Sequence, residues 1–600
     1  MKASDRDRAV RIANCSGFFG DRLSAAKEMV EGASGDNGID VLTGDWLAEL
    51  TMLILHKQRM RNPEAGYAST FLLQIEQVLA TCIERGIKIV TNAGGLNPEG
   101  CAEKVRQIAA KLGLDVKVAH VEGDDLMGRI EELRPQLNHL DTGASLTGEP
   151  VSANAYLGGW GIAAALEAGA DVVVCGRVTD AAIVVGPAAW WHGWQRDDWD
   201  ALAGAVVAGH VIECGTQATG GNYSWFEEIP DPTLPLGFPI AEVAADGSSV
   251  ITKHEGTGGI VNVGTVTAQL LYEIASPAYA NPDVVSRFDT IQLSQEGPNR
   301  VRISGTVGEP EPPTTKVCIN LEGGYRNRMS FVLTGLDQQR KADWLTEALF
   351  RRVGGRERFD DVDVRLVEAS SDAPTQEQAS GRLHITVKSR DERLAGKAFS
   401  GAAIELALAN YPGFFATGGP SEAQAYGVYW PALVDADEVH EQVVLWDGTR
   451  SNIRVPRARA SERPDTRVSG TQGSDHSSPG VGVITRMATA AAESVGPAVG
   501  EPLGACFGAR SGDKGGNANV GIWSRDDAGY AWLQQHLTAE KVKALLPEAA
   551  DLEVRRYELA NIKALNFVIV GLLGEGVASS TAFDAQAKGL GEYLRSRIWR

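Results

Sequence analysis

The sequence predicts an α/β protein whose N-terminal part is a mostly parallel sheet. In residues 1–230, a short β-branched run is repeatedly followed by a loop rich in Gly, Asn and Asp and then by an amphipathic stretch. This order is typical of βα units, in which a helix connects one parallel strand to the next. At least five strands fit the pattern, namely AVRIA, IDVL, IKIV, VKVAH and DVVVCG.

Helices are expected between these strands at about residues 21–31, 45–59, 98–112 and 178–190. The segment LGGWGIAAALEAGA predicts one more helix before DVVVCG. The connections are short, so the strands should form one compact layer.

The pattern changes after Pro230. Residues 231–455 contain the β-rich segments GSSVITKHEG, GIVNVGTVT, RVRISGTVG and TTKVCINLEGGYRN, with helical stretches near 337–353 and 397–410. We therefore predict an α+β extension of the first domain over residues 231–455.

The C-terminal part should be a separate domain. Residues 456–501 are rich in Ser, Pro, Gly and charged side chains, which predicts a flexible linker. In residues 502–600 the candidate strands LGACFG, ANVGIW, LEVRRYEL and FVIVGLLG alternate with helical stretches near 527–546 and 583–597. This alternation predicts an α+β domain of about 100 residues.

Composition and charge exclude several classes of partner. The 57 basic and 77 acidic residues give a net charge of −20, which opposes binding to nucleic acid or anionic lipid. No apolar run approaches the roughly 18 residues of a membrane span, and the N-terminus lacks the apolar core of a signal peptide. The seven Cys residues never form CxxC, so neither a disulfide framework nor a thiolate zinc site is indicated. We expect a cytoplasmic protein with reduced thiols, no nucleic-acid partner and no membrane partner.

The candidate site lies at the carboxyl ends of the parallel strands, where loops, backbone N–H groups and helix N-termini converge. Helix capping is the alternative role for Asp21 and Asp45, which stand just before helical stretches. The loops would bring together Asn14, Cys15, Ser16, Asp21, Thr43, Asp45, Asn92, Glu122, Asp124, Asp125, Arg177 and Asp180.

Three side chains in these loops suggest chemistry. Cys15 is a candidate nucleophile, but no His is positioned to activate it, so a buried structural thiol is the stronger alternative. Asp124, in the run GDD, could act as a general base or help to hold Mg²⁺, unless this is simply a solvated acidic loop. Arg177 is suited to binding a carboxylate or phosphate, with an internal ion pair to Asp180 as the alternative.

Two later loops are also unusually polar. GHVIECGTQATGGNYSWFEEIP, residues 209–230, offers Glu213 as a candidate general base, His210 as the alternative base, and Asn222 and Tyr223 as binding groups. KHEGTGGIVNVGT, residues 253–265, contributes His254. A tight turn between strands is the alternative for both.

The segment GARSGDKGGNANVGI of the C-terminal domain carries Arg510, Asp513 and Lys514 in what we predict to be a Gly-rich connection. These side chains could bind a carboxylate or phosphate, or cover the site of the first domain as a lid. A solvated hairpin loop is the alternative. A dinucleotide fingerprint is not predicted at Gly159-Trp160-Gly161, because SANAYLG before it is not a convincing strand.

A resemblance to a known family rests on ten segments of the first 455 residues. They are NCSGFFGD, LTGDWLAELTM, TNAGGLNP, VEGDD, SANAYLGGWGI, CGRVTDAA, GHVIECGTQATGGNYS, GFPIAEV, ITKHEGTGG and TAQLLYEI. These resemble the N-terminal domain of the acyclic terpene utilisation proteins called AtuA. GARSGDKGGNANVGI resembles the C-terminal domain of the same family, which implies a ferredoxin-like fold for residues 502–600.

The resemblance implies a role in the catabolism of citronellol, geraniol and related branched acids. The leading hypothesis is an enzyme acting on an acyl-CoA thioester or its carboxylic acid by lyase or hydratase chemistry. The alternatives are a non-catalytic scaffold subunit for a neighbouring acyl-CoA carboxylase and a Cys-dependent acyl hydrolase. Coenzyme A would be part of the substrate, Mg²⁺ is an optional ion, and no covalent cofactor is expected. A homo-oligomer is expected because most soluble oligomeric proteins are assemblies of identical chains.

Overall fold

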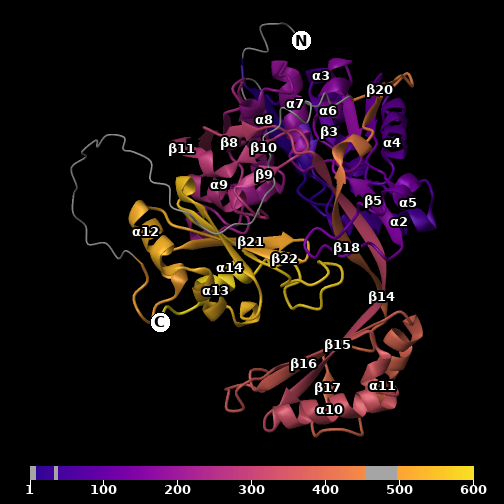
Figure 1. Ribbon diagram of the computed structural model, residues 1–600, viewed down its shortest axis with the longest axis vertical. Coiled ribbons are helices and arrows are strands. Elements are labelled where there is room, and N and C mark those ends of the chain that lie inside the picture. Colours follow the sequence, from indigo (N-terminus) through magenta and orange to yellow (C-terminus); the bar gives the residue numbers. More distant parts are fainter. Residues whose placement is uncertain (1–7, 33–37, 454–495) are drawn as a thin grey trace.

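The computed structural model describes residues 8–32, 38–453 and 496–600 (Figure 1). The predicted linker, residues 456–501, lies outside the described residues except for its last six. No helix in the described ranges is long and apolar enough to cross a membrane.

The five predicted strands are confirmed and form the parallel centre of a large sheet. Their order is β1 (Val10–Asn14), β2 (Val41–Gly44), β3 (Lys88–Thr91), β6 (Val172–Cys175) and β4 (Val118–Glu122). Antiparallel strands extend this sheet at both of its edges. The sheet therefore combines strands that come before and after residue 230 in the sequence. Beyond β1 lie β7 (Pro239–Val243), β8 (Ser249–Lys253), β12 (Arg300–Ser304) and β11 (Gln292–Gly297), and beyond β4 lie β19 (Gln442–Val444) and β20 (Arg450–Asn452).

Helices cover both faces of the sheet, because successive side chains of a strand point to opposite faces and both are apolar here. Ala13 of β1 packs with one set of helices, α1 (Ala25–Gly32), α3 (Ser69–Arg85) and α4 (Pro98–Lys111). Ile12 packs with the other set, α6 (Trp160–Glu167), α7 (Ala182–His192), α8 (Trp199–Ile212) and α9 (Val263–Leu270). Two further helices are α2 (Glu49–Arg61) and α5 (Ile130–Leu133).

Three assignments made from the sequence need correction in this layer. The interpretation of residues 209–230 as a polar loop is wrong at its start, because His210 lies in the last turn of α8, whose uniformly apolar residues showed no helical period. GIVNVGTVT was assigned to the β-rich part, yet α9 begins there, since the Asn262 side chain accepts the Thr265 N–H and completes a capping box. SANA is a strand after all, β5 (Pro150–Ala155), but it pairs antiparallel with β14 outside the parallel sheet, so no dinucleotide-binding unit results.

A second sheet carries a projecting lobe, residues 324–424. Its spine is the 21-residue strand β14 (Thr314–Thr334), which pairs along most of its length with β18 (Gln424–Asp435). In the lobe, β15 (Asp361–Val367), β16 (Ser380–Ser389), β14 and β17 (Phe415–Ala416) form one layer. Helices α10 (Gln338–Arg352) and α11 (Phe399–Glu405) cover one face of it. Figure 1 shows the lobe held away from the rest of the chain on β14 and β18. A small sheet of β9 (Ala278–Ala280), β10 (Val285–Arg287) and β13 (Val307–Glu309) packs against α8.

The C-terminal domain is an antiparallel sheet with helices, as predicted. Its strand order is β21 (Gly508–Lys514), β22 (Asn517–Trp523), β24 (Ala564–Ile569) and β23 (Val554–Leu559), packed with α12 (Asp527–His536), α13 (Ala539–Leu545) and α14 (Leu590–Ser596). The prediction of a Gly-rich connection is wrong, because GARSGDK is itself β21. Only Gly515 and Gly516 form the turn, and Lys514 pairs directly with Asn517.

The glycines of this hairpin let it dock closely on the first domain. A Cβ on Gly512 would lie 2.6 Å from the Tyr272 ring, and one on Gly521 would lie 2.6 Å from the Leu271 Cβ. Asn519 joins the same surfaces, since its Nδ2 donates to the Leu271 carbonyl at 2.7 Å and its Oδ1 accepts the Glu273 N–H at 3.0 Å. The high glycine content of the segment therefore reflects packing between domains.

Replacing Gly512 with Ala should strain this interface, because the added methyl group meets a buried ring. We expect the first urea-unfolding transition, followed by Trp fluorescence, to lose about 1–3 kcal/mol. The control is Gly401→Ala in α11, where a Cβ meets nothing within 4 Å and the substitution should leave stability unchanged or slightly raised. Equal losses in both variants would contradict the docking.

Candidate functional site

The carboxyl edge of the parallel strands faces the β21–β22 hairpin, and charged side chains from both domains gather between them. We call this set the interdomain charge cluster. Its members interact electrostatically across the domain boundary, as Lys514 does with Glu49, Asp180 and Glu273. The cluster comprises Asp45, Glu49, Arg177, Asp180, Glu213, Glu273, Lys316, Arg510, Asp513, Lys514 and Lys588.

Arg177, which follows β6, is held at the floor of the cluster. Its Nη1 donates to the Leu47 carbonyl at 3.0 Å and lies 3.3 Å from Asp180 Oδ1, and its guanidinium stacks 4.2 Å from the centre of the Tyr156 ring. The predicted ion pair with Asp180 is thus present. A guanidinium fixed in this way is preorganised to bind an anion.

Asp124 lies behind Arg177 and positions it. Its Oδ2 accepts the Arg177 backbone N–H at 2.9 Å and an N–H of Asn154 at 2.8 Å. Burial raises the pKa of Asp124 to about 7. Since both contacts are internal, the geometry favours a positioning role for Asp124 over proton transfer to a ligand.

Glu49 and Lys316 form a second charged pair, beside Tyr156. Tyr156 Oη donates to Glu49 Oε1 at 3.0 Å, and Lys316 Nζ lies 3.4 Å from the same oxygen. Burial would raise the pKa of Glu49, but Lys316 and Arg177 outweigh it and lower this pKa to about 2. Glu49 is therefore ionised throughout the physiological range.

The hairpin contributes Lys514, which meets Glu273. Lys514 Nζ donates to the Glu273 carbonyl at 2.8 Å, and Lys588 Nζ lies 3.4 Å from Glu273 Oε1. Glu273 has a φ of +54°, a left-handed conformation that is uncommon for a side-chain-bearing residue and often found at functional sites. Burial and then Lys316 lower the pKa of Lys514, and burial and then Asp513 raise that of Glu273.

Glu213 lies at the end of α8, with its side chain almost fully buried. Asn14 fixes this end, because its Nδ2 donates to the Ile212 and Glu213 carbonyls at 2.6 and 2.8 Å. Burial, Asp180 and Asp45 raise the pKa of Glu213 well above its usual value. The raised pKa favours the protonated form of Glu213, which is the form that can donate a proton.

His210 is a poorer candidate. Its Nδ1 lies 3.7 Å from Glu213 Oε1, and its ring packs on Tyr279 and Phe288. Burial and then Lys514 lower its pKa to about 3, so it is a weak base at neutral pH. The contacts favour a core role for His210.

Asp45 and Asn92 are paired at the ends of β2 and β3. Asn92 Nδ2 donates to Asp45 Oδ1 at 2.6 Å, and its Oδ1 accepts the Trp46 N–H at 2.8 Å. Helix α2 begins four residues later without a side-chain cap, so Asp45 does not cap it. Burial and Asp180 raise the pKa of Asp45 to about 8.

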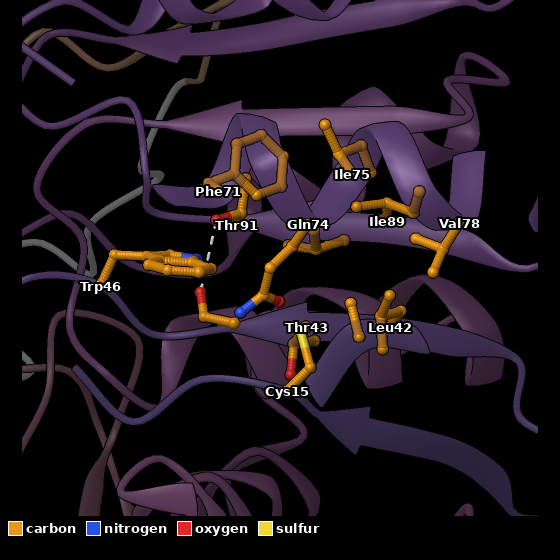
Figure 2. A pocket seen from close by; sticks show the side chains of 13 residues that line it. Cys15, Leu42, Thr43, Trp46, Phe71, Gln74, Ile75, Val78, Ile89 and Thr91 are labelled. Carbon is orange, nitrogen blue, oxygen red and sulfur yellow. Dashed lines mark hydrogen bonds between the residues drawn. The ribbon is translucent and has the colours of Figure 1, made fainter. Parts of the chain in front are cut away.

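Cys15 points away from the cluster into an apolar cavity beneath α3. Figure 2 shows its sulfur near Thr43 and Gln74. The cavity volume is only about 10 Å³, room for little more than one water molecule. Burial raises the pKa of the thiol, so a structural role is favoured over a nucleophilic one. Ser16 is similarly occupied, with its Oγ donating to the Phe18 carbonyl at 3.1 Å.

Three predicted binding residues lie elsewhere. Asn222 is exposed on a turn, and Tyr223 Oη donates to Glu228 at 3.1 Å. His254 Nε2 contacts the Met29 carbonyl at 2.9 Å and lines a separate hollow of about 570 Å³. From the C-terminal domain, Arg510, Asp513 and Lys514 do join the cluster. Arg510 contacts Gln217 and stacks 4.3 Å from the Tyr272 ring.

Sequence reasoning missed five polar residues of this region, namely Glu49, Tyr156, Glu273, Lys316 and Lys588. No sequence pattern distinguishes Glu49, because Asp45 precedes helix α2 and the two residues do not share a helix face. Lys316 and Glu273 interrupt apolar segments, TTKVCIN and QLLYEIA, where a lone charge is costly unless it is paired. The sequence around Lys588 shows no such pattern that would indicate a site residue.

Comparison with protein families agrees with this two-part architecture. The sequence model described as "Acyclic terpene utilisation family protein AtuA" matches residues 10–445, and that of the "AtuA ferredoxin-like domain" matches residues 502–598. The chain belongs to the AtuA family. No curated protein sequence matched this AtuA-family chain.

The charge cluster of this AtuA protein remains reachable by solvent. Although protein surrounds them closely, the side chains of Glu49, Asp180, Lys316 and Glu273 keep 29–31% of their surface exposed. A polar ligand group could therefore reach them. In the parts of the chain that the structure describes, no three His, Cys, Asp or Glu side chains are arranged to hold a metal ion.

The raised pKa of Asp45 predicts a pH-dependent stability for this AtuA protein. The folded pKa is above the unfolded one, so the folded state binds more protons and wild-type stability falls as pH rises from about 4 to about 8. Asp45→Asn keeps the accepted hydrogen bonds without the charge, so its stability should depend less on pH. Urea unfolding at pH 5 and pH 8.5 checks this, with the exposed Asp343→Asn as control. A wild-type slope that Asp45→Asn leaves unchanged would contradict it.

Proposed function

We propose that this AtuA-family chain is an enzyme of acyclic terpene catabolism that moves a proton on a branched acyl substrate. The substrate would be a CoA thioester or its carboxylic acid, and the reaction a lyase or hydratase step. The family's association with acyclic terpene utilisation supports the pathway. The observation that carries the chemistry is the interdomain charge cluster.

The charge of the cluster favours an anionic ligand or intermediate. Burial raises the pKa of Asp45 to about 8, so this carboxyl group is largely neutral near pH 7, and burial also raises the pKa values of Glu213 and Glu273. Arg177 and Lys316 stay charged, because nearby Tyr156 and carboxylates outweigh burial and raise their pKa values. These two fixed positive charges would stabilise a carboxylate or the enolate of a thioester.

Two groups are suited to moving the proton. Lys514, with its lowered pKa, would act as the general base that takes a proton from the carbon next to the carbonyl. Glu213, whose pKa burial raises, would in its protonated form give a proton to the departing group in elimination, and as the carboxylate it would take one from water in the reverse hydration. Arg177 and Lys316 would hold the oxygen on which negative charge develops. Since Lys514 comes from the C-terminal domain, both domains are needed for the site.

Proton exchange into the substrate tests this proposal without knowledge of the product. The purified chain is incubated in D₂O with branched acyl-CoA thioesters and the matching free acids, with and without Mg²⁺, and deuterium uptake is measured by mass spectrometry. We expect uptake into at least one of them. Lys514→Met and Glu213→Gln should each reduce its rate about 10²–10⁴-fold, the usual contribution of a general acid or base.

The matched controls are Lys541→Met, a partly buried lysine of the same domain that is not in the charge cluster, and Glu31→Gln, an exposed glutamate; both should exchange at the wild-type rate. Circular dichroism establishes that each variant is folded. Absence of both binding and exchange across the panel would overturn the enzymatic proposal. Co-purification with an acyl-CoA carboxylase in that case would point to the scaffold role instead.

A further inference from the structure

The lobe presents a strand with a free edge. In the order β15-β16-β14-β17, β15 is at the end of the layer, and no other strand of the described chain pairs with its outer side. The one hydrogen bond found to the β15 backbone from beyond the layer is a long one, 3.4 Å, from exposed Arg356 to the Val362 carbonyl. Free strand edges are templates for pairing with another strand.

The sequence of β15, DVDVRLV, is complementary to itself in one antiparallel register. With Val364 opposite its own copy, Asp363 stands opposite Arg365 on both sides of the two-fold axis. On the other face Val362 stands opposite Leu366, so apolar residues meet apolar residues. The charge match and the apolar match occur in the same register. A strand edge with no role in pairing would not be expected to show both.

The faces of β15 fit this pairing. The side chains of Val362, Val364 and Leu366 lie on the side covered by the lobe helices, and they are only partly buried. Asp363 and Arg365 lie on the opposite face, with Oδ1 of Asp363 2.9 Å from Nε of Arg365 within one chain, and their side chains are 19% and 37% exposed. An antiparallel pair about a two-fold axis keeps each residue on its own face, so the helices of the two lobes would lie on one side of a continuous sheet.

The charge of the lobe also favours association between two lobes. Residues 324–424 contain 14 Lys and Arg and 14 Asp and Glu, so the lobe is neutral in a chain of net charge −20. Two copies repel each other least through their neutral parts. The lobe projects from the larger domains (Figure 1), and its hydrogen bonds to residues 579–581 come from Arg326, Arg328 and Lys388 at its base, so two lobes could meet through β15 without contact between the larger domains.

We propose that β15 pairs antiparallel with β15 of a second copy of this chain, joining two lobe sheets across a two-fold axis. The pairing is isologous, so it closes at a dimer. One short strand edge buries little area, so the dimer should be concentration-dependent. Exposed Val367, 59% accessible, would be partly covered at each end of the paired strands. This inference does not rest on the proposed function.

Sedimentation velocity of the full chain between 1 and 100 µM tests the proposal. We expect the wild-type chain to shift from monomer to dimer over this range. Asp363→Arg and Arg365→Asp each place like charges opposite one another twice, and each should weaken the dimer about tenfold or more. The double variant Asp363→Arg/Arg365→Asp restores opposite charges in the same register and should recover dimerisation.

The control Asp343→Arg makes the same charge change on an exposed position of α10 and should dimerise like the wild type. Hydrogen exchange gives a second readout, since the amides of residues 361–367 should become protected as the concentration rises. A wild-type chain that stays monomeric at 100 µM would overturn the proposal. So would dimerisation unchanged in Asp363→Arg, or a double variant that fails to recover.

Discussion

The docking of the C-terminal hairpin on the first domain depends on one amide side chain, that of Asn519. It donates to the Leu271 carbonyl and accepts the Glu273 N–H, so it satisfies two backbone groups that a buried interface would otherwise leave unpaired. The same contact holds Glu273 at a positive φ. Lys514, two residue pairs further along the hairpin, then donates to the Glu273 carbonyl. The position of the charged groups thus follows from how the two domains are joined.

The buried charges are tolerable because most of them are compensated. An isolated charge inside a protein is costly, whereas a carboxyl group can lower that cost by taking up a proton. Glu49 remains ionised because Lys316 and Arg177 lie beside it, while burial and the nearby Asp180 and Asp45 raise the pKa of Glu213. One small region therefore contains both fixed charges and neutral acids, the combination that acid–base chemistry requires.

Much of the fold could be predicted from the sequence, because periodic patterns report buried faces. The five parallel strands and the chain-end domain followed from alternation of β-branched runs and amphipathic stretches. Helix α8 was not predicted from the sequence, because it is buried on all sides and has no polar face. The second strand of the hairpin, ANVGIW, was predicted, but GARSGDK suggested a Gly-rich connection, because the sequence does not show that its Gly512 packs closely on Tyr272.

The candidate site was predictable only in part, because sequence patterns report local structure and not contacts between distant segments. Arg177 and Asp45 follow directly from the rule that parallel strands end at one edge, and Glu213 follows from the polar stretch of residues 209–230. Glu273, Lys316 and Lys588 come from elements far away in sequence, and only the docking of sheet, lobe strand and C-terminal domain brings them together. Local patterns contain no information about such long-range encounters.

Strand β14 sets a fixed distance between the charge cluster and the lobe. Lys316 contributes to the charge cluster, and Arg328 stands on the same strand within the lobe, about 40 Å away at roughly 3.3 Å per residue. A partner that binds the lobe at this point is held at this distance from the interdomain charge cluster. Each copy in an assembly joined through the lobes would then receive and release its ligand without obstruction by its neighbour.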